Sequence, residues 1–173
     1  GQERTLAAVW RARPPRHWRA APQPDIFDVK RDALSVLEAL GAPIASLQTS
    51  GDVPAHWRPG RTGALKLGPK TVAYFGEIHP RALKAIDVEG PALAFEIFLD
   101  ALPPPRARGR AKPPLEKLDL QPLTRDFAFI VDDGVAAADL LRAGFGAAKQ
   151  LITDVSLFDV YPGERMSPGK KSL

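Results

Sequence analysis

Hydrophobic residues along the first hundred positions follow two different periods. Over 64–67 they alternate with small or polar residues, and over 71–78 they run almost unbroken, with Gly68-Pro69 between the two segments. This pattern predicts an antiparallel hairpin, and the nearly all-apolar second segment predicts a central, covered strand. Further apolar runs over 5–10 and 92–98 are also typical of strands.

One segment before this hairpin has helical spacing. The apolar residues that fall on one face of a helix over 25–40 are Val29, Ala33, Val36, Leu37 and Leu40. Asp25 or Asp28 can cap its start, and Gly41 stands where a C-terminal cap belongs. Pro80 is well placed at the first turn of a short helix over 81–86, because its missing N–H is not needed there. A long helix packed on a mainly antiparallel sheet is an α+β architecture.

A second pattern begins near residue 118. It predicts strands over 126–131 and 151–161, a helix over 136–150 and the start of a third strand at 170–173. This order is the opening of the ferredoxin-like split βαβ topology, which needs a further helix and a further strand. The residues that follow 118 are too few for both, so we expect a truncated ferredoxin-like domain.

Charge and proline divide the chain between these two patterns. The formal net charge is +4, and the stretch 101–118 accounts for the whole excess. Its basic residues are Arg106, Arg108, Arg110, Lys112 and Lys117, and its prolines are Pro103, Pro104, Pro105, Pro113 and Pro114. Such a stretch is typical of an extended linker; the alternative is a basic strap that also touches nucleic-acid phosphates. We therefore expect a first domain at 1–102, a basic proline-rich linker at 103–117 and a second domain at 118–173.

Composition and motif searches exclude several classes of protein. There is no cysteine, which excludes disulfides, thiolate metal sites and cysteine nucleophiles. No apolar run approaches the roughly 18 residues that cross a bilayer, so we expect a cytoplasmic protein without membrane contact. The phosphate-cradling patterns G-x-x-x-x-G-K-[ST] and G-x-G-x-x-G are missing, as is the nucleophile elbow G-x-S-x-G.

Polar residues at the end of the predicted central strand have two interpretations. Glu77 and His79 share a strand face, and with Glu96 or His56 they could hold a divalent metal or act as an acid–base pair in a small hydrolase. However, no H-E-x-x-H or comparable ligand spacing is present, and Pro80 places His79 at a strand-to-helix corner. We therefore interpret these residues as a polar corner with no metal and no catalytic role.

The segment before the hairpin is open to two interpretations as well. Gly60 can supply a backbone conformation that other residues resist, while Arg58 and Arg61 could bind an anion. We favour a structural turn with solvated arginines.

Five short motifs share their order and spacing with one known family. Residues 25–32 are similar to D-F-[FY]-D-x-K-G-D, 58–62 to H-P-G-R-S, and 76–80 to G-x-[LIV]-H-P followed by a strand at 94–96. The two corner motifs are carried by Pro59, Gly60, Arg61, Gly76, Glu77, His79 and Pro80. The last two motifs are Arg125-Asp126-Phe127-Ala128, and Leu157-Phe158-Asp159-Val160-Tyr161 with Gly169-Lys170-Lys171-Ser172-Leu173. Together they resemble the C-terminal region of the bacterial phenylalanyl-tRNA synthetase β subunit.

The resemblance implies a fold and a role for each domain. The first would be a degenerate copy of a class II synthetase catalytic fold that lacks the ATP-binding signatures. The second would be the start of a ferredoxin-fold anticodon-binding domain. Amino-acid activation would belong to a separate α subunit in an α2β2 assembly that uses ATP and magnesium, so no catalytic residue, metal or cofactor is expected in this chain.

The implied partners are the α subunit and tRNA-Phe. The candidate tRNA contacts are Arg125, Lys170, Lys171, Arg106, Arg108 and Arg110. Lys170 and Lys171 have an alternative role as exposed lysines that guard an edge strand. The alternative to a synthetase scaffold is a free-standing paralogue that acts as an amino-acid or protein-interaction module.

Overall fold

A computed structural model describes residues 3–11, 18, 23–104, 120–161 and 166–173. The chain divides into two compact units, residues 1–110 and 111–173, called unit 1 and unit 2 below. The linker arginines Arg106, Arg108 and Arg110 lie outside the described residues.

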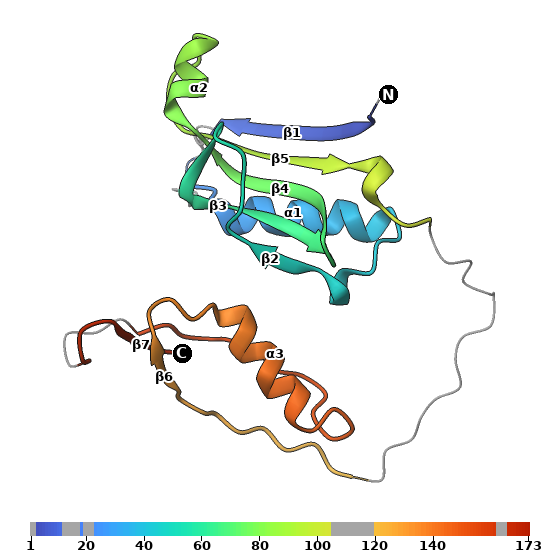
Figure 1. Ribbon diagram of the computed structural model, residues 1–173, viewed down its shortest axis with the longest axis vertical. Helices are drawn as coiled ribbons and strands as arrows, with labels where there is room; N and C mark the ends of the chain where they lie inside the picture. The colour runs from blue at the N-terminus through green and yellow to red at the C-terminus, as the bar shows by residue number, and fades with distance from the viewer. Residues whose placement is uncertain (1–2, 12–17, 19–22, 105–119, 162–165) are drawn as a thin grey trace. The chain divides into compact units, whose positions relative to one another are not determined.

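Unit 1 is built on an antiparallel sheet with one long helix across a face (Figure 1). Its described strands are β1 (Thr5–Arg11), β2 (Gln48–Ser50), β3 (Trp57–Leu67), β4 (Lys70–Ile78) and β5 (Ala92–Phe98), in the order β1-β5-β4-β3-β2. The helices are α1 (Ile26–Ala39) and α2 (Pro80–Ala85), with single 3-10 turns η1 (Ile44–Ser46) and η2 (Leu99–Ala101). Every neighbouring pair of strands is antiparallel, which confirms the predicted α+β architecture.

Helix α1 begins with a complete capping box. The Asp25 side chain accepts hydrogen bonds from the backbone N–H groups of Phe27 and Asp28, and the Asp28 carboxylate accepts one from the Asp25 N–H. The Asp25 N–H and the Arg31 guanidinium both stabilise the ionised Asp28 carboxylate and lower its pKa. These bonds satisfy N–H groups that have no partner within the first helical turn. They explain why the helix starts where the sequence predicts.

The core of unit 1 lies between α1 and the sheet. Val29, Ala33 and Leu37 are buried against side chains from β3, β4 and β5, which are Leu65, Val72, Ala73, Phe75, Leu93, Phe95 and Ile97. The prediction that Leu40 belongs to this buried face is wrong, since Leu40 is exposed. The helix ends one residue earlier, and Leu40 is its C-cap.

Both helices of unit 1 end in the same hydrogen-bonded motif. After α1, Ala42 N–H donates to Leu37 O and Gly41 N–H to Glu38 O; after α2, Val88 N–H donates to Leu83 O and Asp87 N–H to Lys84 O. This is the Schellman arrangement, which needs a left-handed residue at its turn. Gly41 supplies it after α1 with φ +79°, whereas Asp87 holds φ +56° after α2.

We expect Asp87→Gly to stabilise unit 1 by roughly 0.5–1 kcal/mol, because glycine adopts the left-handed region without steric cost. Urea unfolding followed by tryptophan fluorescence measures the change. The reverse exchange at the equivalent position, Gly41→Asp, should destabilise the unit by a similar amount. A loss of stability in Asp87→Gly would show that the aspartate makes a compensating interaction.

Unit 2 contains a short strand pair and one helix within its described part. Strand β6 (Ile130–Asp132) pairs antiparallel with β7 (Lys170–Ser172), and α3 (Ala137–Ala147) follows β6. Tyr161 exchanges two hydrogen bonds with Ser172, which places the segment before it on the other edge of β7. The resulting order of segments is the one expected at the opening of a ferredoxin-like domain.

Two strand predictions for unit 2 are wrong in extent. The strand predicted over 126–131 begins only at Ile130, and the one predicted over 151–161 is reduced to the single bridge at Tyr161. The helix predicted over 136–150 spans Ala137–Ala147. Strands exist only where a neighbour offers backbone partners. Within the described residues, Tyr161 pairs with β7 at Ser172.

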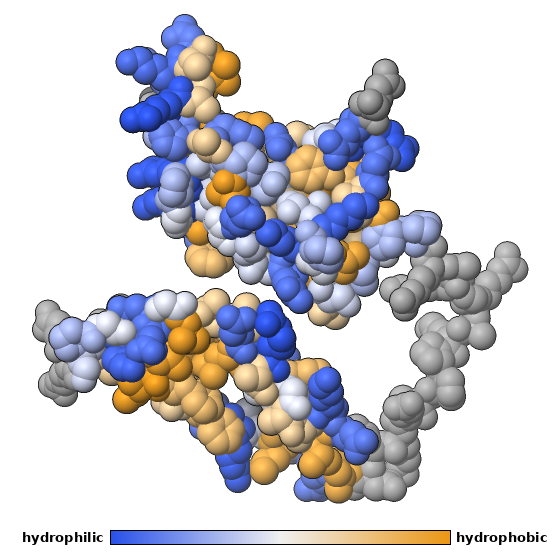
Figure 2. Space-filling model, in the orientation of Figure 1, coloured by the Kyte–Doolittle hydropathy of each residue, from blue (hydrophilic) through white to orange (hydrophobic). Residues whose placement is uncertain are grey.

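Unit 2 keeps its large apolar side chains exposed. Among the described residues of this unit, only Leu173 is buried. The exposed ones include Leu123, Phe127, Phe158 and Tyr161, and Figure 2 shows hydrophobic side chains over much of its visible face. In the described part of the chain, no helix is long and apolar enough to span a membrane.

Candidate functional site

The motif at 58–61 forms a bulge inside strand β3. The register pairs Trp57 with Ile78 and then Thr62 with Gly76, so residues 58–61 stand opposite Glu77 alone. Gly60, with φ +76°, supplies the left-handed conformation at the exposed tip. The prediction of a turn before the strand is therefore wrong, because the strand starts ahead of the motif and continues through it.

A buried carboxylate holds this bulge. The side chain of Glu77 is 6% exposed, and its Oε1 accepts a hydrogen bond from Arg58 Nη1 while Oε2 lies 3.5 Å from Arg61 Nη1. The two arginine side chains remain 43% and 62% exposed. Both arginines are thus partly solvated, and the carboxylate buried in β4 also orients their guanidinium groups.

Gly76 allows the bulge to lie directly on β4. Its φ is +130°, and a Cβ atom at this position would lie 2.4 Å from Arg61 O and 2.6 Å from Thr62 Cα. The Thr62 hydroxyl in turn donates to Arg58 O at 3.1 Å. The glycine of this motif is therefore required by a close backbone approach.

His79 and Pro80 start helix α2. His79 Nδ1 accepts a hydrogen bond from Arg81 N–H at 3.1 Å, and Pro80 occupies the first helical position. The His79 N–H donates to His56 O at 2.8 Å, which ties the corner to the residue before β3. Among the described residues, no three His, Asp or Glu side chains are placed to hold a metal ion. Of the residues considered for a metal site, His79 serves as an N-cap and Glu77 as an ion-pair anchor.

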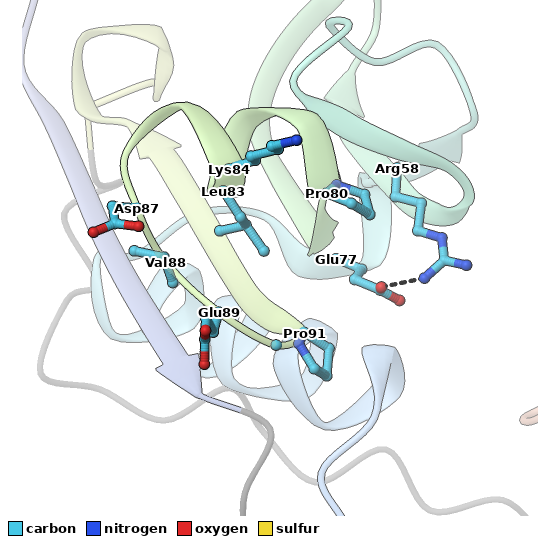
Figure 3. Close-up of a pocket in the computed structure, with 10 residues that line it drawn as sticks. Arg58, Glu77, Pro80, Leu83, Lys84, Asp87, Val88, Glu89 and Pro91 are labelled. Atoms are coloured by element: carbon cyan, nitrogen blue, oxygen red, sulfur yellow. Dashed lines mark hydrogen bonds and ion pairs between the residues drawn. The ribbon is translucent and has the colours of Figure 1, made fainter.

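An open groove of about 560 Å³ lies beside this corner (Figure 3). Arg58 and Glu77 form one wall, α2 contributes Pro80, Leu83 and Lys84, and residues 87–91 form the remainder. No motif in the sequence marks Lys84 or residues 87–91 as part of a site. Their only signal is the Gly90-Pro91 break, which indicates a loop but not a groove.

The candidate RNA contacts that the structure describes lie in unit 2. Lys170 Nζ lies 2.5 Å from Asp132 Oδ1, and Lys171 Nζ donates to Asp133 O at 2.7 Å. Arg125 is exposed and bonds Thr124 O at 3.1 Å. The two lysines therefore lie in β7 at the end of the β6–β7 pair, beside the Asp132 carboxylate and the Asp133 backbone carbonyl.

Comparison with known families assigns both units. The model described as "Phenylalanyl tRNA synthetase beta chain CLM domain" matches residues 1–99, and that of the "Ferredoxin-fold anticodon binding domain" matches residues 119–173. The chain belongs to the phenylalanyl-tRNA synthetase beta-chain family. The resemblance seen in the five motifs is confirmed.

Similar proteins support the same family. The phenylalanine–tRNA ligase beta subunits of Rhodospirillum rubrum and Paramagnetospirillum magneticum are each 51% identical over 100% of this chain and 22% of their own length. The beta subunit of Bradyrhizobium diazoefficiens is 50% identical over 91% of this chain and 20% of its own. The chain thus spans about a fifth of the length of these relatives.

Proposed function

We propose that the chain is a non-catalytic part of a phenylalanine–tRNA ligase β subunit. Unit 1 would be a scaffold with a degenerate class II catalytic fold, and unit 2 an RNA-binding module for the anticodon stem and loop of tRNA-Phe. The observation that carries this proposal is the pair of family matches, which assign the two units in the same order as the motifs.

In this proposal the chemistry belongs to a separate α subunit. That subunit would activate phenylalanine with ATP and magnesium in a cytoplasmic α2β2 assembly. The sequence supports this division because it has no glycine-rich G-x-G-x-E-R segment.

The exposed cations of unit 2 are suited to an RNA backbone. Proteins hold RNA stems largely through contacts of lysine and arginine with phosphates and 2′-hydroxyls. Arg125 bonds only a neighbouring carbonyl within the described residues, so its guanidinium keeps free donors. Lys170 and Lys171 must share their ammonium groups with Asp132 and the Asp133 carbonyl, which reduces the net gain from each phosphate contact. Arg106, Arg108 and Arg110 remain further candidates for contact with the tRNA.

Replacing Lys170 and Lys171 with alanine in the full-length subunit should weaken binding of tRNA-Phe. If both lysines contact phosphates, the slope of log K against log salt concentration should shrink by roughly 1 for each lysine. Fluorescence anisotropy with labelled tRNA-Phe over a salt series measures both quantities.

Lys70→Ala, at the β3–β4 turn of unit 1, is the matched control and should leave the slope unchanged. An unaltered slope in the double variant would remove the two lysines from the interface. A free-standing paralogue, by contrast, would show no salt-dependent preference for tRNA-Phe at all.

A further inference from the structure

The bulge of unit 1 at residues 58–61, called the arginine bulge below, carries donor groups that a scaffold does not need. The side chains of Arg58 and Arg61 are 43% and 62% exposed, and both contact oxygens of the buried Glu77 carboxylate. A guanidinium has five N–H groups, and each of these arginines directs one Nη1 donor to Glu77. Most donors of both arginines are therefore available to a ligand.

Glu77 orients the two arginines before any ligand arrives. Because they contact the two oxygens of one carboxylate, their guanidinium groups lie close together. Figure 3 shows the Arg58 guanidinium beside Glu77, on the side of the groove away from Asp87 and Glu89. An arginine that is already held loses less side-chain freedom when it binds, so this arrangement favours binding.

The shape and the charge of the bulge favour a phosphodiester as the ligand. Its tip is open to solvent, since Pro59 and Gly60 are exposed and nothing lies within 4 Å of a Cβ atom at Gly60. Small-molecule sites are enclosed, whereas an open tip suits the outer surface of a large anion. Two arginines and one carboxylate leave one net positive charge, which a phosphodiester balances; a phosphomonoester carries about −1.5 to −2.

The composition of the bulge favours RNA over a protein carboxylate. Arginine in a protein interface contributes most beside aromatic and aliphatic anchors in a desolvated centre. The exposed part of the bulge has the sequence Pro59-Gly60-Arg61, and the large apolar residue next to it, Trp57, is buried. The planar guanidinium fork, on the other hand, matches the oxygens of a phosphate without any apolar neighbour.

We propose that Arg58 and Arg61 hold a phosphodiester group of the tRNA backbone, so that unit 1 binds RNA as well as unit 2. The inference rests on the proposed function, which supplies the tRNA, and gives the scaffold unit a direct contact with it. Contacts with phosphates carry no sequence information. The arginine bulge therefore contributes affinity and salt dependence, and does not distinguish tRNA-Phe from other tRNAs.

Arg61→Ala in the full-length subunit tests this contact with little risk to folding, because Arg61 lies 3.5 Å from Glu77 and Arg58 stays in place. Fluorescence anisotropy with labelled tRNA-Phe should show binding weakened roughly 3- to 10-fold near ~0.1 M salt. The slope of log K against log salt concentration should shrink by roughly 1. Arg61→Lys keeps the charge and should keep the slope, but it should lose part of the affinity because lysine lacks the planar fork. Circular dichroism melts verify that each variant is folded.

Arg31→Ala is the matched control, since it removes an arginine of α1 that also pairs with a carboxylate, and it should leave affinity and slope unchanged. Equal affinity and slope in Arg61→Ala and the wild type would overturn the inference. Calorimetric titration with AMP provides the arm for a free phosphate. Binding of AMP that depends on Arg61, with tRNA binding unchanged in Arg61→Ala, would show a phosphomonoester site and would also overturn it.

Two further outcomes separate the inference from the proposed function. If Arg61→Ala weakened association with another protein and left tRNA binding unchanged, the bulge would be a protein contact and the inference would be wrong. If Lys170 and Lys171 proved necessary for tRNA binding and Arg61 did not, the inference would fail while the proposed function stood. If the wild-type subunit did not bind tRNA-Phe at any salt concentration, the proposed function itself would fail.

Discussion

Gly76→Ala is expected to destabilise unit 1 by about 3 kcal/mol or more, the largest effect of any single change proposed for this chain. Two unfavourable contributions to the folding free energy add at this position. Alanine resists the φ of +130°, and its Cβ would lie 2.4 Å from a backbone oxygen that cannot rotate away as a side chain could. The steric clash can be relieved only if the bulge moves away from β4. That movement would lengthen the contacts of Arg58 and Arg61 with Glu77.

Urea unfolding followed by tryptophan fluorescence measures this loss in unit 1, because all three tryptophans, Trp10, Trp18 and Trp57, lie in that unit. Gly51→Ala is the control, since nothing lies within 4 Å of a Cβ there and its φ is ordinary. The control should change stability by no more than about 0.5 kcal/mol. Equal effects of the two substitutions would contradict the close approach seen at Gly76.

Arg58→Ala is expected to destabilise unit 1 by about 2 kcal/mol. The substitution leaves the Glu77 carboxylate buried with only the 3.5 Å contact to Arg61. Breaking a fully buried ion pair costs about 3–5 kcal/mol, and a smaller loss is expected here because Arg58 is partly screened by solvent. Denaturant titration of the variant measures the loss.

A double-mutant cycle separates this electrostatic cost from lost packing. In the Arg58→Ala background, Glu77→Gln should recover part of the lost unfolding free energy, because burying a neutral amide costs less free energy than burying an unpaired carboxylate. Effects that simply add would show that the two residues do not interact.

Arg31→Ala breaks an exposed pair with Asp28 and should cost no more than about 0.5 kcal/mol.

In unit 1, the sequence predicts those elements whose stabilising interactions lie within a few residues of one another. Helix α1 has an apolar face and a capping box within its own residues, and α2 has Pro80 at its first turn. The contact of Arg58 with Glu77 has no such signal, because the two residues are 19 positions apart. Only the register of β3 on β4, with its bulge, brings them together. A proline and a glycine in that stretch indicate a turn as readily as a bulge.

In unit 2, the pattern of apolar residues does not predict how long each strand is. The segment 151–161 has strand-like residues, but among the described residues its pairing is the single bridge of Tyr161 with Ser172. The RNA contacts likewise depend on what surrounds each cation. The motifs predict Lys170 and Lys171 as contacts, but nothing in the sequence indicates that Asp132 and Asp133 lie beside them. Their role in tRNA binding stays a prediction.

We propose above that this chain belongs to a synthetase subunit that binds tRNA but does not itself catalyse the charging of tRNA. The most direct test is attachment of phenylalanine to tRNA-Phe by the full-length β protein, by the α subunit and by both together, with ATP and magnesium present. We predict charging only when both subunits are combined. Charging by the β protein alone, or a rate with α that the β protein does not change, would contradict the account.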